Sequence, residues 1–293
     1  MRAILAAGAA LILMSTAASA QQQAIRPDQQ AFRSIYQELV NIDTSMATGS
    51  CTRAANAMAA HLRDAGYPAS DLQVIVPEGH PEDGNVVAVL HGASRGHALL
   101  LLAHIDVVDA RREDWERDPF TLVEENGYFF GRGTADNKAG VVMLAETFLA
   151  LRREGFRPTR DLIIAFTGDE ETIGQGARML AQEHRDLIDA EFALNSDAGQ
   201  GGLSETTGQP TTYGLQAAEK TFASFTITAH NEGGHSSQPR ADNAIFDVAD
   251  AIEAVRHYQF PVMWNDITIA SMRAGGAATT GPLGAAMTRF ANH

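Results

Sequence analysis

The chain of 293 residues has one cysteine, few basic residues and only 7% aromatic residues. Because Cys51 stands alone, no intramolecular disulfide can form, and a disulfide-stapled fold is excluded. The 22 Lys and Arg residues face 36 Asp and Glu residues, which leaves a formal net charge of −14. This acidic balance argues against nucleic acid or an anionic membrane as the main partner.

The sequence has enough apolar residues, 45%, to bury a sizeable core, so global disorder is excluded. Its length allows one large domain or two ordinary ones. The first twenty residues read as a signal peptide, with Arg2 as a short positive region, an apolar stretch from Ala3 to Met14, and a cleavage site at Ala18-Ser19-Ala20. An uncleaved anchor or a buried N-terminal helix is the alternative.

The apolar stretch is too short for a good transmembrane helix. We therefore expect residues 1–20 to be removed and the mature protein to be exported without a membrane segment. Export to the periplasm and secretion into the medium both stay open.

Apolar strands alternate with helical patterns along the first two thirds of the chain. The expected strands are Asn85–Leu90, Ala98–Ala103, Leu162–Thr167 and Phe192–Asn195, and the expected helices include Cys51–Asp64, Ala139–Arg153 and Ile173–Glu183. This alternation predicts an α/β fold with a mostly parallel sheet between helices, over residues 21–212.

The composition shifts after Asp197. Residues 199–214 are rich in Gly, Ser, Thr and Gln, as in a linker or loop. Beyond them, Thr221–Ala229 alternates like a half-exposed strand, and Asn243–His257 has the pattern of an amphipathic helix. This pattern predicts that residues 213–293 form part of a second, smaller α+β domain. The glycine-rich residues 275–282 near its end show no pattern of a closing strand.

Polar residues follow the buried strands at their carboxyl ends, where sites form in open α/β sheets. His104 and Asp106 follow one strand, Gly168 to Glu171 follow the next, and Ser196-Asp197 follow a third. A glycine-rich loop, residues 131–140, leads into a helix between them. Crowded carboxylates repel one another, and a pair of divalent metal ions would remove that penalty.

Each of these pieces has a plainer interpretation when it is taken alone. His104 could be a structural histidine, Glu170-Glu171 a solvated helix start, and the glycine-rich loop a tight turn. The loop lacks the residues of a phosphate cradle, and the chain has no G-x-S-x-G or H-E-x-x-H motif. Cys51 is expected to be a small buried residue far from the cluster.

Five stretches together resemble the zinc metallopeptidase family that includes acetylornithine deacetylase, succinyl-diaminopimelate desuccinylase, carboxypeptidase G, aminoacylase, peptidase T and carnosine dipeptidase. They are Leu101–Val108, Tyr128–Gly140, Phe166–Gly174, Asn195–Asp197 and Gly233–Pro239. The resemblance runs from about residue 30 to the end of the chain. It implies a catalytic domain, in which helices sandwich the sheet, and an inserted lid domain. A homodimer formed through the lid domain is an open alternative.

The resemblance also implies roles for the metal site. His104, Asp136 and Asp197 would bind a first zinc ion, and Asp136 would bridge to a second zinc ion bound by Glu171. Asp106 would orient His104. The family's second zinc ion also takes a histidine near the end of the catalytic domain, and neither His257 nor His293 is assigned to that role. We therefore expect a C-terminally truncated chain that binds one of two zinc ions firmly.

The implied activity is hydrolysis of an amide bond in a peptide or an N-acyl amino acid. Glu170 would act as the general base, and His235 of the lid domain would reach the substrate carbonyl. The aspartate at position 197 resembles the family's aminopeptidases and dipeptidases, which favours an exopeptidase or dipeptidase. The alternatives are an N-acyl-amino-acid deacylase and a non-catalytic, truncated binding protein.

Overall fold

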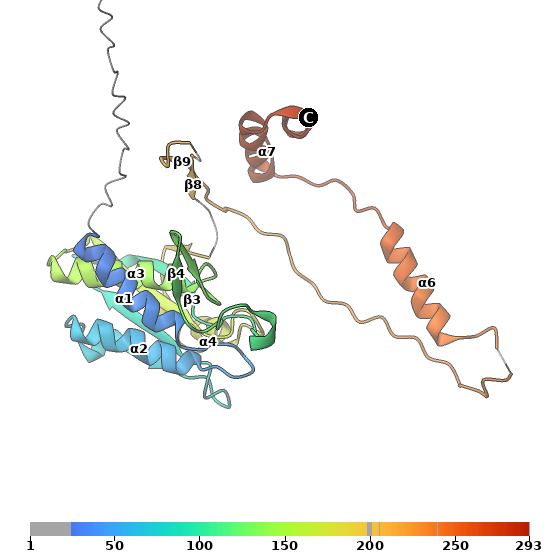
Figure 1. Ribbon diagram of the computed structural model, residues 1–293, viewed down its shortest axis with the longest axis horizontal. Helices are drawn as coiled ribbons and strands as arrows, with labels where there is room; N and C mark the ends of the chain where they lie inside the picture. Colours follow the sequence, from blue (N-terminus) through green and yellow to red (C-terminus); the bar gives the residue numbers. More distant parts are fainter. Residues whose placement is uncertain (1–24, 198–200, 205, 239, 293) are drawn as a thin grey trace, which may run out of the picture. The chain divides into compact units, whose positions relative to one another are not determined.

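The computed structural model describes residues 25–197, 201–204, 206–238 and 240–292 (Figure 1). The chain consists of two compact units, one up to Ala198 and one from Gly199. The expected signal peptide, residues 1–20, lies outside the described residues. Over the described residues, no helix is both long and apolar enough to cross a membrane.

A five-stranded mixed sheet forms the centre of the first unit, with strand order β1-β2-β6-β3-β7. Its strands are β1 (Leu72–Ile75), β2 (Asn85–Leu90), β3 (Ser94–His104), β6 (Arg160–Thr167) and β7 (Phe192–Asn195). β3 pairs in parallel with β6 and β7, whereas β2 is antiparallel to both β1 and β6. The expected α/β fold is confirmed, with parallel pairing confined to β6, β3 and β7.

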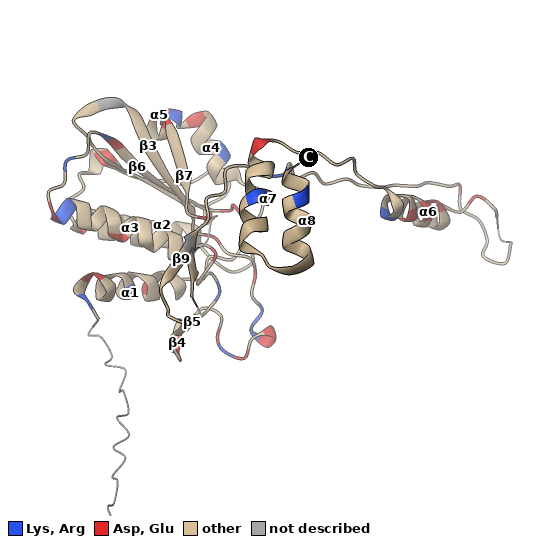
Figure 2. Ribbon diagram, turned by 90° about the horizontal axis from the view of Figure 1, so that it is seen from above, with Lys and Arg blue, Asp and Glu red and all other residues tan. Residues whose placement is uncertain are grey.

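Helices cover both faces of this sheet (Figure 2). On one face lie α1 (Pro27–Val40), α2 (Cys51–Asp64) and α3 (Lys138–Arg153), and on the other lie α4 (Gln175–Glu183) and the short α5 (Arg185–Ile188). Met58 and Phe148 belong to the larger apolar cluster, which fills the first interface. Leu100 and Leu180 belong to a smaller cluster under α4 and α5.

Helix α2 shows why the sequence pattern locates the helices well. The Ser50 side chain accepts a hydrogen bond from the backbone N of Arg53 at 3.1 Å, which caps the first turn. Met58 and Leu62, four positions apart, are fully buried against the sheet. The helix has the expected bounds because its cap and its apolar stripe are both local features.

The strand register brings three strand ends to one edge of the sheet. His104 at the end of β3 lies opposite Thr167 at the end of β6, and Leu102 lies opposite Asn195 at the end of β7. Because these strands run parallel, the segments that follow them start side by side. A small hairpin of β4 (Val123–Glu125) and β5 (Tyr128–Phe130) precedes the loop that enters α3.

The second unit contains the hairpin of β8 (Gly201–Leu203) and β9 (Pro210–Tyr213), then helices α6 (Ala244–His257), α7 (Asp266–Ala278) and α8 (Gly281–Ala291). α6 matches the expected helix, and Asn243 caps it through a bond from the backbone N of Ile245 at 3.0 Å. α7 and α8 form a helical hairpin, which the sequence analysis did not predict because the segment is rich in glycine. A Cβ atom on Gly276 would lie 2.5 Å from Oγ1 of Thr288, so the two helices approach closely.

The strand expected at Thr221–Ala229 does not form, and that prediction is wrong. Residues 214–235 carry no regular secondary structure. Phe222 is 89% exposed and Phe225 is 88% exposed, so neither face of the segment is buried. A strand is stabilised by ladder hydrogen bonds and by packing, and alternation in the sequence supplies neither when no partner strand is paired with it.

Candidate metal centre

Four segments meet at the edge of the sheet where β3, β6 and β7 end. They are the end of β3 with the residues after it, the loop after β6, the loop after β7, and the glycine-rich loop before α3. The structure brings together five side chains that the sequence singles out: His104, Asp136, Glu170, Glu171 and Asp197. Chain segments far apart in sequence thus contribute to one cluster.

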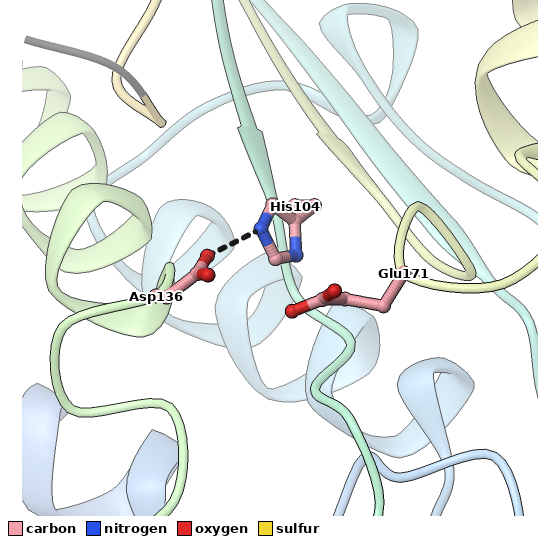
Figure 3. A group of neighbouring side chains, drawn as sticks. All are labelled: His104, Asp136 and Glu171. Atoms are coloured by element: carbon pink, nitrogen blue, oxygen red, sulfur yellow. Dashed lines mark hydrogen bonds and ion pairs between the residues drawn. The ribbon is translucent and has the colours of Figure 1, made fainter. Parts of the chain in front are cut away.

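His104 lies at the centre of a first group with Asp136 and Glu171 (Figure 3). Nε2 of His104 is 2.9 Å from Oδ1 of Asp136, and the three potential ligand atoms all lie within 4.8 Å of one another. His104 is buried at the end of β3, Asp136 is exposed in the loop before α3, and Glu171 is half-buried. Their side chains point toward one another from three elements (Figure 3).

A second group shares the same histidine. His104, Glu170 and Asp197 also place potential ligand atoms within 4.8 Å of one another. Nε2 of His104 lies 3.5 Å from Oδ1 of Asp197. The glutamates at 170 and 171, neighbours in the chain, therefore belong to different groups around one imidazole ring.

Asp106 is almost fully buried behind His104, with 4% exposure. Nδ1 of His104 lies 3.1 Å from the backbone O of Asp106 and 3.3 Å from its Oδ1. The other carboxylate oxygen, Oδ2, accepts a hydrogen bond from the backbone N of Glu171 at 2.8 Å. Asp106 therefore contacts the ring of His104 and also holds the loop that carries Glu171.

The cluster is electrostatically unbalanced. Burial alone would lower the pKa of His104, but the surrounding carboxylates, led by that of Asp106, raise it to about 10. Burial and neighbouring carboxylates raise the pKa of Glu170, Glu171 and Asp197 above their usual values. The site therefore concentrates negative charge that only His104 offsets among these groups.

This donor set fits a divalent metal ion. One imidazole nitrogen and several carboxylate oxygens converge within the distance that a single ion can span. The second nitrogen of the histidine is held by a carboxylate residue, the arrangement that commonly supports metal-ligating histidines. A cation would also relieve the mutual repulsion that raises the carboxylate pKa values.

Three residues have supporting roles that the sequence analysis did not predict. Asp169 accepts hydrogen bonds at 2.8 Å from the backbone N atoms of Gln175 and Gly176, which ties the loop bearing both glutamates to the start of α4. Asn85 accepts a bond from the backbone N of Gly168 at 3.2 Å. An aspartate a few residues before a helix is a usable capping signal, whereas the Asn85 contact spans 83 residues and has no local signature.

Lys138 is the third, and it is fully buried at the start of α3. Its Nζ donates to the backbone O of Ile42 at 2.7 Å, so it joins the glycine-rich loop to the segment before α2. Burial lowers the pKa of Lys138 to about 8. Sequence spacing excluded a phosphate cradle here but offered no sign that this lysine would point inward.

Cys51 is buried, as expected, but its expected distance from the cluster is wrong. It lines a cavity together with Asp106 and Asp169, and its Sγ lies 3.7 Å from the backbone O of Thr44. The parallel bridge between Ser45 and Val107 brings the start of α2 under the end of β3. That long-range pairing leaves no trace in the local sequence.

His235, the remaining candidate, lies in the second unit. It is exposed in a turn where Nδ1 is 2.8 Å from Oγ of Ser237. Its described hydrogen bonds stay within that turn. The reach of His235 to a substrate carbonyl stays a prediction.

The comparisons with known proteins agree with this geometry. The model of "Peptidase family M20/M25/M40" matches residues 100–281, a stretch that includes all five clustered side chains. The N-fatty-acyl-amino acid synthase/hydrolase PM20D1 of Xenopus tropicalis is 32% identical over 170 residues, which are 57% of this chain and 33% of that protein. Acetylornithine deacetylase of Shigella sonnei is 29% identical over 264 residues, 84% of this chain and 63% of that protein.

Among solved structures, human carnosine dipeptidase 1 is similar with a TM-score of 0.50 and 22% identity, over 58% of this chain and 39% of that one. At this identity the likeness shows the fold alone. The chain spans about a third of the length of the first relative and less than two thirds of the second.

Proposed function

The chain belongs to peptidase family M20/M25/M40, and we propose that it is a zinc-dependent hydrolase that cleaves amide bonds as an exopeptidase or dipeptidase. The family is metal-dependent, usually with zinc. The observation that carries the proposal is the convergence of His104 with two carboxylate pairs at the carboxyl edge of the sheet. Because the chain spans only part of its relatives, activity and substrate are argued from these residues.

The residues divide into two ligand sets. His104, Asp136 and Asp197 would hold the first zinc ion, supported by Nε2 distances of 2.9 Å to Asp136 and 3.5 Å to Asp197. Asp136 and Glu171 would hold the second, with Asp136 shared. Zinc ions bound there would lower the pKa of a water molecule toward 7 and polarise the scissile carbonyl group.

Glu170 is the proposed general base. It is exposed, it adjoins the metal ligand Glu171, and it lies in the group formed with His104 and Asp197. It would accept the proton of the attacking water and deliver it to the leaving nitrogen of the substrate. Asp169 and Asp106 hold the loop that carries it, through bonds at the start of α4 and to Glu171.

A deacylase acting on N-acyl amino acids is the second candidate. The relatives named N-fatty-acyl-amino acid synthase/hydrolase and acetylornithine deacetylase favour it. Asp197 favours peptides as substrates, because an aspartate at this position resembles the family's aminopeptidases and dipeptidases. Hydrolysis rates on unblocked dipeptides and on acetylated amino acids, compared at equal concentration, decide between them.

The test of the proposed function compares two adjacent substitutions. Glu170→Gln should keep zinc at the parental content and lower kcat by at least 100-fold, because it removes only the base. Glu171→Gln should lower zinc content, measured in zinc-containing buffer where the second position is occupied, and should also lower activity. Zinc by mass spectrometry and amide hydrolysis are measured on both. Activity of Glu170→Gln within tenfold of the parent would rule out its role as base.

We also propose that the protein is exported after removal of residues 1–20, to the periplasm or the medium. The support is the sequence of that segment. N-terminal sequencing of the protein recovered from an exporting host tests this, with Gln21 as the expected first residue.

A homodimer through residues 213–293 is proposed on the resemblance alone and is tested by sedimentation.

A further inference from the structure

A small cavity adjoins Asp106, the residue that contacts Nδ1 of His104. Its volume is about 70 Å³, and its lining includes Thr44, Cys51, Asp106, Val107 and Asp169. None of the residues assigned to zinc lines it. The cavity is thus separate from the ligand cluster, but one wall is the residue that orients His104.

Two buried polar atoms belong to residues of this lining and make no hydrogen bond to any residue that the structure describes. They are Oδ1 of Asp106 and Oγ1 of Thr44. Asp106 is 4% exposed and Thr44 is 1% exposed. Leaving a buried polar atom unpaired costs about 1–3 kcal/mol, and more for a charged group, so native proteins almost always satisfy such atoms.

The backbone of Thr44 is hydrogen-bonded to the segment that follows β3. Its carbonyl O accepts a bond from the backbone N of Val107 at 3.3 Å and lies 3.7 Å from Sγ of Cys51. The segment is therefore fixed beside Asp106 while its hydroxyl group stays available. A cavity of this size accommodates one or two water molecules, which need polar partners of this kind.

We propose that this cavity holds ordered water that joins the Thr44 hydroxyl to Oδ1 of Asp106, and that Thr44 is thereby a positioning residue of the metal centre. The proposal rests on the proposed zinc site. Oδ1 lies 3.3 Å from Nδ1 of His104 without a hydrogen bond, and Oδ2 is held by the backbone N of Glu171. Water bonded to Oδ1 supplies the hydrogen bond that this oxygen lacks and so further restrains the plane of the carboxylate. Thr44 touches neither metal nor substrate and acts only through Asp106.

Fixing that carboxylate fixes two proposed ligands at once. One side of Asp106 holds Nδ1 of His104 and the other holds the backbone N of Glu171. A rotation of the carboxylate would therefore displace a ligand of the first zinc ion and the loop that carries a ligand of the second. Losing a partner behind a metal ligand typically lowers metal affinity 10- to 100-fold.

The experiment compares Thr44→Val with Thr44→Ser in the full chain. Val keeps the shape of Thr and removes the hydroxyl group, whereas Ser keeps the hydroxyl group. Zinc affinity is measured by competition with a chelator, and the absorption spectrum of bound cobalt(II) reports ligand geometry. We expect Thr44→Val to weaken zinc binding about tenfold and to change the cobalt spectrum. Thr44→Ser should stay within twofold of the parent.

Thr44→Ala is the second variant, in case the methyl group that valine places where the hydroxyl group stood prevents folding. It enlarges the cavity, so a further water molecule can replace the hydroxyl group, and its loss of affinity should be smaller than that of Thr44→Val. Equal zinc affinity and equal cobalt spectra in the parent and all variants would overturn the role of Thr44 alone. A parent chain that binds no zinc would overturn the proposed metal centre itself.

Discussion

At the scale of single residues, the site depends on one histidine shared by two groups of carboxylates. His104 faces Asp136 and Asp197 through Nε2 and Asp106 through Nδ1. The sequence singled out these residues because each follows a strand or lies in the glycine-rich loop, and the resemblance to the metallopeptidase family implied their roles. It could not predict Asp169, Asn85 or Lys138, whose importance arises from hydrogen bonds to backbone groups that become neighbours only in the fold.

Asp136 is the residue whose loss should do most damage. It is the proposed shared ligand, so Asp136→Ala should remove zinc from both positions and abolish hydrolysis. Zinc content by mass spectrometry and hydrolysis of a dipeptide check this. Asp186→Ala, at an exposed aspartate in α5, is the matched control and should behave as the parent. Full zinc content in Asp136→Ala would exclude a bridging role.

Cys51 should be chemically inert in the folded protein. Burial, reinforced by the charge of Asp106, raises the pKa of its thiol to about 12, so the reactive thiolate is nearly absent below pH 10. Alkylation with iodoacetamide at pH 8 should be at least 100-fold slower in the native chain than in urea. Equal rates in both conditions would mean that α2 does not pack as described.

At the scale of elements, two loops of the site are joined at the start of α3. Nδ2 of Asn137 lies 3.4 Å from Oγ of Ser196, which connects the loop of Asp136 to the loop of Asp197. Gly140 makes this approach possible, because a Cβ atom there would overlap the side chains of both Asn137 and Ser196. The helix α3 could be predicted from its apolar period, but this contact with β7 could not.

Gly140→Ala tests whether the close approach of Ser196 to α3 matters more than the helix propensity of residue 140. Alanine favours a helix interior by about 1 kcal/mol over glycine, so helix propensity alone would stabilise the protein. The overlap with Ser196 should instead displace Asp197 and lower zinc affinity at least tenfold. Met143→Ala, on the exposed side of α3, is the control and should leave affinity unchanged. Zinc affinity equal to the parent in Gly140→Ala would show that Ser196 moves without Asp197.

The success of sequence analysis also differs between elements. β2, β7 and α2 have the expected bounds because continuous apolar runs, caps and breakers mark them locally. The sequence analysis did not predict the short strands β1, β4 and β5. The expected strand at Thr221–Ala229 failed because pairing, which a sequence pattern does not report, decides whether alternation becomes a strand.

At the scale of the whole molecule, the five clustered side chains all belong to the first unit, whose sheet has one apolar cluster on each face. The second unit contributes His235 to the proposed mechanism only as a prediction. The domain boundary near residue 212 was inferred from composition and stays a prediction. The sequence analysis did not predict α7 and α8 of the second unit, because glycines normally weaken helices. Here the glycines allow the two helices to pack closely.

The most direct test of the central claim is the zinc content of residues 21–293 after dialysis against metal-free buffer. Among the described residues, three are proposed for the first position, namely His104, Asp136 and Asp197, and two for the second, namely Asp136 and Glu171. Since a zinc site normally takes three protein ligands, we predict close to one firmly bound zinc ion per chain and a second that dialysis removes. A chain that retains no zinc would contradict the metal centre, and two firmly bound ions would contradict the proposed ligand sets.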